Sequence, residues 1–496
     1  MRFSLRCMTL ILLMALVLRL VALGTRSLWY DETFAVLFSE KGLNAMLYGT
    51  LTQTQGIAAD VHPLLYYTTL DGWMGVFGES PILVRLLSVF FGLISLALLF
   101  RLTRDLFDVR TALLAALIGA IAPFEIQYSQ EARMYALLAL LLLGTTWCFL
   151  RAWRTNKALW WLVFGVLAGL AMYAQQLAAF YLFAIGLPPL LLRRRDRIVG
   201  LVLGIGMALV IYFPWLINLP AQLGKIGDYW IPRPTPVQLL QTLWSFLSVE
   251  LPVANPAILV VSITSLVLIL ELLLLRAFDA FRRRSRDSAP LAFALYLAII
   301  PVGLMWLVSQ WKPVYLTRAL LPSALMFYIA LGWLMARSRL PRPLFVFIAV
   351  MFGLTVVSTL SIYYTWDTFP RPPFEVADIY IAGQWQAGDR IVHANKITAL
   401  PMIYYNRSLP QSYLRDAPGS PEDTLATATQ QTLGLFADDN INNATKGSSR
   451  VWFVIFQEQI AQQGGQSPDQ DWLNANYQLA EQVAFNDLQI YRYDLK

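Results

Sequence analysis

The sequence predicts a polytopic α-helical membrane protein that ends in a small extracytoplasmic α/β domain. Three observations lead to this prediction. Of the 496 residues, 57% are hydrophobic and 14% are charged, whereas soluble domains average roughly 45–50% and 25%. Apolar stretches long enough to cross a hydrocarbon core of about 30 Å recur through the first 366 residues. Residues 370–496 have a soluble composition and a net charge of −5, against +12 for the residues before them.

This composition excludes an intrinsically disordered chain, a fibrous repeat and a disulfide scaffold. The overall net charge of +7 could suggest a nucleic-acid partner, but the basic residues fall between apolar stretches, as membrane-topology signals do. We therefore expect no nucleic acid. Cys7 and Cys148 both lie in apolar stretches and predict neither a disulfide nor a metal site. Two histidines, His62 and His393, are too few for a His-rich metal site.

Eleven apolar stretches are predicted to span the bilayer. They are residues 5–24, 81–100, 111–127, 132–150, 158–176, 178–192, 198–218, 256–276, 290–309, 319–336 and 343–364. The first could be a signal peptide, but Val21-Ala22-Leu23-Gly24 is a poor cleavage site, so we predict a retained helix. Residues 62–77 are apolar but interrupted by polar residues and Pro, which predicts an interfacial segment.

Basic clusters orient these spans. They occupy residues 2–6, 101–110, 151–157, 193–197, 276–286 and 337–342, which all lie on one face if the spans alternate. The positive-inside rule makes that face cytoplasmic. The predicted transmembrane domain, residues 1–366, then has extracytoplasmic loops at 25–80 and 219–255, and residues 370–496 form the extracytoplasmic domain. We expect an integral protein of a bacterial inner (plasma) membrane.

The soluble tail mixes helical and strand patterns. Residues 374–386 have helical periodicity, and residues 390–394 and 451–456 read as strands. Residues 477–485 and 488–494 predict a hairpin around Asn486-Asp487. The tail is therefore predicted to be a small α/β domain.

Two acidic motifs on the outer face are candidates for chemistry. Asp31 and Glu32 follow the first span, and adjacent carboxylates can supply a general base and a metal or hydrogen-bond partner. The plainer alternative is the solvated start of a surface helix. Glu131 and Arg133 stand at the mouth of the fourth span, where charges are costly to bury and are often functional. Here the alternative is a pair that anchors the helix at the interface.

Two further outer-face motifs could bind substrate. His62-Pro63 leads into an aromatic segment that includes Tyr66, which is also typical of an interfacial aromatic belt. Lys312 and Arg318 are basic residues on the face that the orientation rule leaves poor in them. They could hold a lipid phosphate, or they could simply extend toward water.

The order of these motifs resembles that of the GT-C glycosyltransferases. "LWYDE", "HPLLYY", "PILVRLLSVFFGL" and "APFEIQYSQEARMYAL" follow one another as in the branch of protein O-mannosyltransferases and aminoarabinose transferases, glycosyltransferase family 39 and relatives. The resemblance covers about residues 20–145, and the span layout extends it loosely to 366. Leu64 replaces the second Pro of the usual His-Pro-Pro, and some relatives have Asp at Glu131. The tail shows no polypeptide-binding MIR domains, which weakens protein as the acceptor.

The resemblance implies a lipid-linked sugar transferase. The donor would be a polyprenyl-phosphate sugar, and the acceptor a hydroxyl of a glycan, lipid or protein of the cell envelope. Transfer would be an inverting single displacement, with Asp31 as the base and with Glu32 and Glu131 orienting the acceptor. No cofactor is implied with certainty; a divalent metal (Mg²⁺ or Mn²⁺) on these three acids stays an open alternative. The implied substrate-binding residues are His62, Tyr66, Tyr128, Arg133, Tyr135, Lys312 and Arg318.

A transporter or flippase is the alternative from another functional class. Transporters place charged or broken-helix features near the membrane midplane. Here the main charges within spans are Arg19 and Glu271, and Glu271 lies toward the cytoplasmic end. The concentration of acids on the outer face favours surface chemistry over transport.

Overall fold

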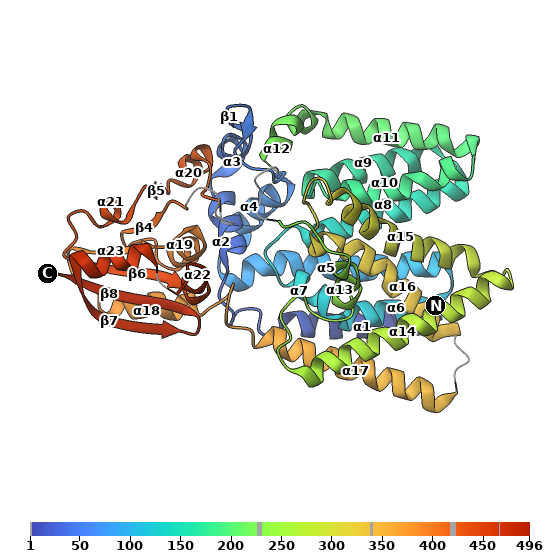
Figure 1. Cartoon of the computed structure of the whole chain (residues 1–496). Helices are drawn as coiled ribbons and strands as arrows, with labels where there is room; N and C mark the ends of the chain where they lie inside the picture. The colour runs from blue at the N-terminus through green and yellow to red at the C-terminus, as the bar shows by residue number, and fades with distance from the viewer. Residues whose placement is uncertain (1, 226–230, 338–340, 417–422, 466) are drawn as a thin grey trace.

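The computed structural model describes residues 2–225, 231–337, 341–416, 423–465 and 467–496. A helical part, α1 to α17, and a C-terminal α/β domain, α18 to β8, lie end to end (Figure 1). This confirms the predicted helical part followed by a small α/β domain. Parts of the predicted outer loop 219–255 and of the basic loop 337–342 lie outside the described residues.

All eleven predicted spans are helical in the structure. They correspond to α1 (Arg2–Leu20), α5 (Pro81–Leu106), α6 (Val109–Ile121) with α7 (Pro123–Ser129), α8 (Tyr135–Thr155), α9 (Ala158–Ala174), α10 (Ala178–Leu191), α11 (Arg195–Leu216), α14 (Pro256–Arg282), α15 (Ser288–Val308), α16 (Leu321–Arg337) and α17 (Arg342–Tyr364). Within the described residues, seven helices are long and apolar enough to cross a membrane, or eight if α6 and α7 form one broken span. The helices α9 and α10 are shorter, at 17 and 14 residues. The count of eleven spans stays a prediction.

The third predicted span, residues 111–127, is not one straight helix. The axes of α6 and α7 differ by 62°. The break falls at Pro123, whose nitrogen has no hydrogen to donate to the preceding turn, so that the helix cannot continue unchanged. After the bend, Gln127 and Tyr128 of α7 are hydrogen-bonded to Glu250, in the predicted outer loop 219–255.

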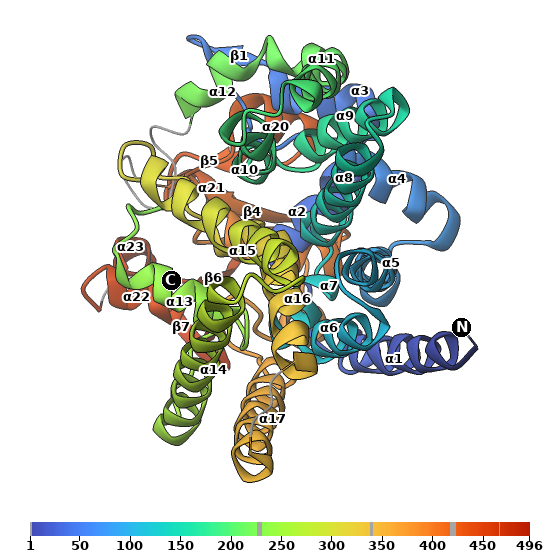
Figure 2. The ribbon, with the colours of Figure 1, turned by 90° about the vertical axis from the view of Figure 1, so that its right-hand side faces the viewer.

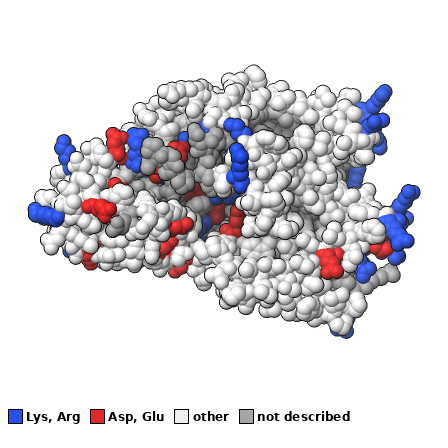
Figure 3. Space-filling view, viewed as in Figure 1, with Lys and Arg blue, Asp and Glu red and all other residues white. Residues whose placement is uncertain are grey.

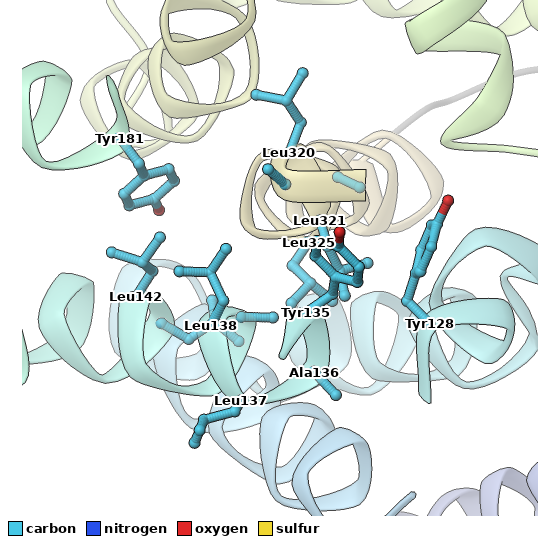
Figure 4. Packing of buried hydrophobic residues seen from close by; sticks show 14 of the residues in the cluster. Tyr128, Tyr135, Ala136, Leu137, Leu138, Leu142, Tyr181, Leu320, Leu321 and Leu325 are labelled. Carbon is cyan, nitrogen blue, oxygen red and sulfur yellow. The ribbon is translucent and has the colours of Figure 1, made fainter. Parts of the chain in front are cut away.

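The degree of burial separates central from peripheral helices. In the stretch Thr317–Arg337, which contains α16, 89% of the apolar window is buried, against 22% in α11 and in α17. Leu321 and Leu325 of α16 pack near Tyr135 and Leu138 of α8 (Figure 4). Figure 2 shows α11, α14 and α17 at the periphery of the helical part. Their exposed apolar side chains would be unfavourable in water and fit contact with lipid.

The two predicted outer loops contain short elements. The first loop forms α2 (Tyr30–Ser39), α3 (Gly42–Leu51), a pair of two-residue strands, β1 (Gln53–Thr54) and β2 (Ile57–Ala58), and α4 (Leu65–Phe77). The second contains α12 (Leu219–Lys225) and α13 (Val237–Ser245), and the 3₁₀ helix η2 (Thr317–Leu320) precedes α16. In Figure 1, α2 lies between the helical part and the C-terminal domain.

The C-terminal domain is built on a mixed six-stranded sheet of order β5-β4-β3-β6-β8-β7. The first four strands are mutually parallel, and β8 is antiparallel to both of its neighbours. The elements are α18 (Phe374–Gly383), β3 (Asp389–His393), α19 (Lys396–Tyr405), β4 (Gln411–Leu414), α20 (Thr427–Leu433), β5 (Ala437–Asp438), α21 (Ile441–Thr445), β6 (Arg450–Phe456), α22 (Gln457–Gln462), α23 (Pro468–Asn476), β7 (Tyr477–Phe485) and β8 (Leu488–Leu495). The predicted helix, two strands and hairpin correspond to α18, β3, β6 and β7–β8.

The domain is fixed by hydrogen bonds to the first of these loops, residues 25–80. The Tyr405 hydroxyl accepts from the Leu28 N–H at 2.9 Å, two residues after Arg26 and three before Asp31. Thr429 Oγ1 donates to the Gly49 carbonyl at 2.8 Å. The sheet domain is therefore attached directly to the segment that carries the Asp31-Glu32 motif.

The predicted topology can be tested by cysteine labelling. Figure 3 shows Lys and Arg gathered at the end of the helical part that lies away from the C-terminal domain. In a background lacking Cys7 and Cys148, we expect a membrane-impermeant thiol reagent added to intact spheroplasts to label Gln463→Cys but not Ser285→Cys; both exposed positions should react after lysis. Labelling of Ser285→Cys alone from outside would overturn the orientation.

Candidate active site

A cavity of about 190 Å³ lies where the helical part meets the C-terminal domain. Its walls come from the α1–α2 connection, α7 and the segment after it, the α13–α14 connection, η2 and the residue before it, and the end of α17 with the chain that follows it. The lining residues are Arg26, Trp29, Gln127, Tyr128, Glu131, Glu250, Leu251, Leu316, Arg318, Tyr363, Trp366, Pro370 and Arg371. Figure 3 shows acidic and basic atoms in the hollow between the two parts.

Asp31 sits in the first turn of α2 and faces two arginines. Its Oδ2 lies 3.3 Å from Arg318 Nη1 and 3.7 Å from Arg133 Nη2. Burial raises the pKa of Asp31, but Arg133 and Arg318 outweigh it and hold the pKa below its usual range. Asp31 is therefore ionised at neutral pH. Arg318 connects it to the cavity, because the same guanidinium also lines that cavity.

Glu32 does not line the cavity and lies in a buried ion-pair network. Its Oε1 accepts from Arg85 Nε at 2.8 Å and from the Ala132 N–H at 3.0 Å, and its Oε2 accepts from Arg85 Nη2 at 2.7 Å. Burial raises the pKa of Glu32, but Arg85 above all outweighs it and lowers the pKa to about 2. With its acceptor sites occupied, Glu32 fits a structural role better than the catalytic role predicted for it.

Glu131 lines the cavity and is held by an arginine from the tail. Arg371 Nη2 donates to Glu131 Oε1 at 2.8 Å. Glu131 Oε2 is buried and, among the described residues, has no hydrogen-bond partner. Burial raises the pKa of Glu131, and Arg371 only partly opposes the rise. Sequence reasoning missed Arg371, because the Pro-rich segment around it has no motif of its own.

Glu250 lines the cavity together with Glu131. Sequence reasoning missed Glu250. The Tyr128 hydroxyl donates to Glu250 Oε2, and the Glu250 N–H donates to Gln127 Oε1 at 2.9 Å. Burial raises the pKa of Glu250. A single acid at the end of a Pro- and aromatic-rich loop gives no sequence signal by itself.

Aromatic rings support the cationic side of the cavity. The Tyr128 ring packs edge-on against Tyr135, with centroids 5.4 Å apart (Figure 4). The Arg318 guanidinium lies 5.3 Å from the Tyr135 centroid, and that of Arg26 lies 4.1 Å from the Tyr363 centroid. Such cation–π contacts are worth about 0.5–2 kcal/mol each. They hold the arginines in place. Arg26 also donates to Gln130 Oε1 and to the Tyr363 hydroxyl, whereas Arg318 Nε has no hydrogen-bond partner among the described residues.

Of the ten predicted site residues, Tyr128, Glu131 and Arg318 line the cavity. Asp31 and Tyr135 adjoin it through Arg318, and Arg133 through Asp31. His62, Tyr66 and Lys312 have other surroundings. His62 Nδ1 is 2.8 Å from Asp60 Oδ1, and the Tyr66 hydroxyl is 3.2 Å from Ser88 Oγ. Lys312 is exposed to solvent and is not among the cavity-lining residues. The structure thus brings together Asp31, Glu131, Tyr128, Tyr135, Arg133 and Arg318, and it does not bring Lys312 to them.

The three predicted metal ligands do not converge on one point. Within the described ranges, no group of three or more His, Cys, Asp or Glu side chains is arranged to hold a metal ion. Asp31 faces Arg318 and Arg133, whereas Glu32 and Glu131 both pair with Arg371. Guanidinium groups at these distances repel a cation. The arrangement therefore does not fit a divalent metal shared by the three acids.

Comparisons with known proteins agree with this architecture. A family model described as dolichyl-phosphate-mannose-protein mannosyltransferase matches residues 61–218. YycA of Bacillus subtilis (strain 168), named as a candidate mannosyltransferase, is 30% identical over 178 residues, which are 34% of this chain. The match covers 25% of the length of YycA.

Solved structures resemble the whole chain. ArnT from Cupriavidus metallidurans matches with a TM-score of 0.62 at 15% identity, covering 98% of this chain and 97% of ArnT. The same protein bound to undecaprenyl phosphate gives 0.61 at 14%, again covering 98% and 97%. AglB from Archaeoglobus fulgidus, in complex with an inhibitory peptide and a dolichol-phosphate, gives 0.54 at 12%, covering 99% of this chain and 74% of AglB. At these identities the likeness shows the fold.

Proposed function

Because the chain has the GT-C fold of membrane glycosyltransferases, we propose that it transfers a sugar from a polyprenyl-phosphate donor to an acceptor hydroxyl on the outer side of a bacterial plasma membrane. The single observation that carries the proposal is Arg318, which lines the cavity and also lies 3.3 Å from the ionised Asp31. One residue thus joins an anion-binding cavity to a candidate base. The motif resemblance, confirmed at the level of fold by ArnT and AglB, supports this reading.

The charge of the cavity suits a sugar phosphodiester. Three arginines and two glutamates line it, which leaves one positive charge when all are ionised. A polyprenyl-phosphate sugar carries one negative charge on its phosphodiester. Charge-assisted hydrogen bonds from arginine to phosphate are among the strong ones, and they gain strength near a low-dielectric boundary. The unpartnered Glu131 Oε2 can accept a hydrogen bond from a hydroxyl of the sugar.

The proposed reaction is a single displacement at the anomeric carbon. Asp31 takes the proton of the acceptor hydroxyl while the hydroxyl oxygen bonds to the anomeric carbon. The bond from that carbon to the phosphate oxygen breaks, and polyprenyl phosphate leaves with the electron pair. The transition state has oxocarbenium character, and Arg318 is placed to offset the charge that grows on the leaving phosphate. Residues 1–366 supply most of these groups, and Arg371 adds one from the start of the tail.

Turnover without a membrane gradient is the decisive test. Purified protein in detergent micelles should release polyprenyl phosphate from a radiolabelled polyprenyl-phosphate mannose when a hydroxyl acceptor extract of the cell envelope is added. The label should pass to the acceptor with inverted anomeric configuration. A transporter or flippase would leave the donor intact in micelles and would only move it between the leaflets of vesicles.

Arg318 should matter far more for lipid-phosphate binding than Lys312. We expect Arg318→Ala to weaken binding of undecaprenyl phosphate by about 10–100-fold, which corresponds to the loss of a hydrogen bond to a charged group. Arg318→Lys should recover only part of the loss, because Lys lacks the guanidinium fork. Calorimetric titration of the purified protein measures this, with the exposed Lys312→Ala as the matched control. Equal binding by Arg318→Ala and wild type would remove Arg318 from the donor site.

A further inference from the structure

The break between α6 and α7 leaves backbone carbonyls without helical partners. Pro123 stands four residues after Gly119 and has no N–H, so the Gly119 carbonyl cannot make its usual helical hydrogen bond. The last carbonyls of any helix also lack partners within the helix. Buried in the helical part, these groups need donors from another element.

Arg19 of α1 supplies those donors. Its Nη2 donates to the Gly119 carbonyl at 3.3 Å, and its Nη1 donates to the Ala120 carbonyl at 3.1 Å and the Ala15 carbonyl at 2.9 Å. The side chain is completely buried. Arg19 Nη2 also pairs with Glu125 Oε2, in the first turn of α7. One guanidinium thus joins the negative end of α6 to the acid at the start of α7.

The other end of α7 is tied to the same helix. Gln130, just after α7, donates from Nε2 to the Arg19 carbonyl at 2.7 Å and to the Val21 carbonyl at 2.8 Å. Its Oε1 accepts from Arg26 Nη2 at 2.9 Å, and Arg26 lines the cavity. Since α7 has seven residues and is too short to be stable by itself, its position depends on these bonds.

We propose that Arg19 and Glu125 are positioning residues that fix α7, so that Gln127, Tyr128 and Glu131 face the cavity. The proposal rests on the proposed function of that cavity. A buried ion pair often contributes no more stability than apolar residues of similar volume. Stability alone therefore does not account for a fully buried pair here, whereas directional bonds to two carbonyls and one carboxylate fix both the place and the angle of the bend.

The experiment separates positioning from stability. Arg19→Met leaves Glu125 buried without its partner, and we expect it to lower the thermal midpoint. The double variant Arg19→Met/Glu125→Leu removes both charges, and we expect it to regain most of that midpoint. Its turnover should nevertheless stay ~10²-fold below that of the wild type, because displacing catalytic groups by about 1 Å has effects of that size. The matched control is Arg337→Met, which removes an arginine with two ion partners at the opposite end of the helices.

A readout independent of turnover completes the test. In a cysteine-free background, Gln127→Cys should be alkylated at a different rate when the double substitution is added, and at an unchanged rate when Arg337→Met is added. The inference is overturned if the double variant regains the thermal midpoint, the turnover and the alkylation rate of the protein that keeps Arg19 and Glu125. The pair would then only stabilise the fold. If the double variant does not fold, Glu125→Gln takes its place, and a normal alkylation rate there overturns the inference. Absence of any turnover in the wild type would count against the proposed function, while the alkylation arm would still decide this inference.

Discussion

We expect Asp31→Asn to lower the rate of sugar transfer by about 10²–10⁴-fold, which is the usual contribution of a general base. The substitution keeps the size of the side chain but removes the group that accepts the proton. It also leaves Arg133 and Arg318 without their carboxylate partner. Binding of undecaprenyl phosphate should therefore be unchanged or tighter, because two cations are freed for the phosphate.

Single-turnover kinetics and calorimetric titration, on the same preparation, measure the two effects separately. Asp105→Asn is the matched control. Asp105 pairs with Arg101 near the C-terminal end of α5 and does not line the cavity. Near wild-type transfer by Asp31→Asn would exclude Asp31 as the base. A parallel fall in transfer and in lipid-phosphate binding would instead indicate that the substitution damages the cavity.

The second large effect concerns stability. Arg85 is completely buried and binds both oxygens of Glu32, and it donates to the carbonyls of Leu23, Arg26 and Ser27 at 2.7–3.0 Å. Arg85→Met leaves the Glu32 charge and three carbonyls without their main partner. Breaking a buried ion pair in this way costs about 3–5 kcal/mol. We expect a large fall in the thermal midpoint measured in detergent, and only a small fall for Arg407→Met, whose ion pairs with Glu40 and Glu79 are partly exposed.

The same pair predicts a pH dependence. Folding lowers the pKa of Glu32 from 4.5 to about 2. The stabilisation is therefore complete above pH 4.5 and is lost as the pH falls toward 2, to a total of about 3 kcal/mol. The thermal midpoint of the wild type should fall through this window more steeply than that of Glu32→Gln. Parallel profiles for the two proteins would show that Glu32 does not titrate in this range.

Long apolar helices were predictable because the bilayer imposes one length and one composition on them. The break in the third span was only half predictable. Pro123 is visible in the sequence, but its effect depends on Arg19, which lies more than one hundred residues away. In the C-terminal domain, β6 and the β7–β8 hairpin were predictable from their patterns. By contrast, β4 and β5 have four and two residues, too few to show a period.

The candidate site divides in the same way. Asp31, Glu131 and Arg133 lie in motifs that resemble a family, and topology alone places them on one face. Arg371 and Glu250 have no local signal, since each acquires its role from a partner more than one hundred residues away. Lys312 is the converse case: it carries the charge expected of a phosphate-binding residue, but its side chain is exposed and does not line the cavity. Residue type and side of the membrane do not determine whether a side chain reaches a cavity.

The contribution of Arg371 to the cavity changes where the chain can be divided. A cut after α17, at about residue 366, would separate Glu131 from Arg371, which lies 2.8 Å from it. Chimaeras that exchange C-terminal domains between relatives should therefore join after Pro373, so that the helical part keeps its own Phe369-Pro370-Arg371 segment. Domains exchanged at the earlier point would bring a foreign residue into the cavity wall, and any change in sugar or acceptor preference would then be wrongly credited to the sheet domain.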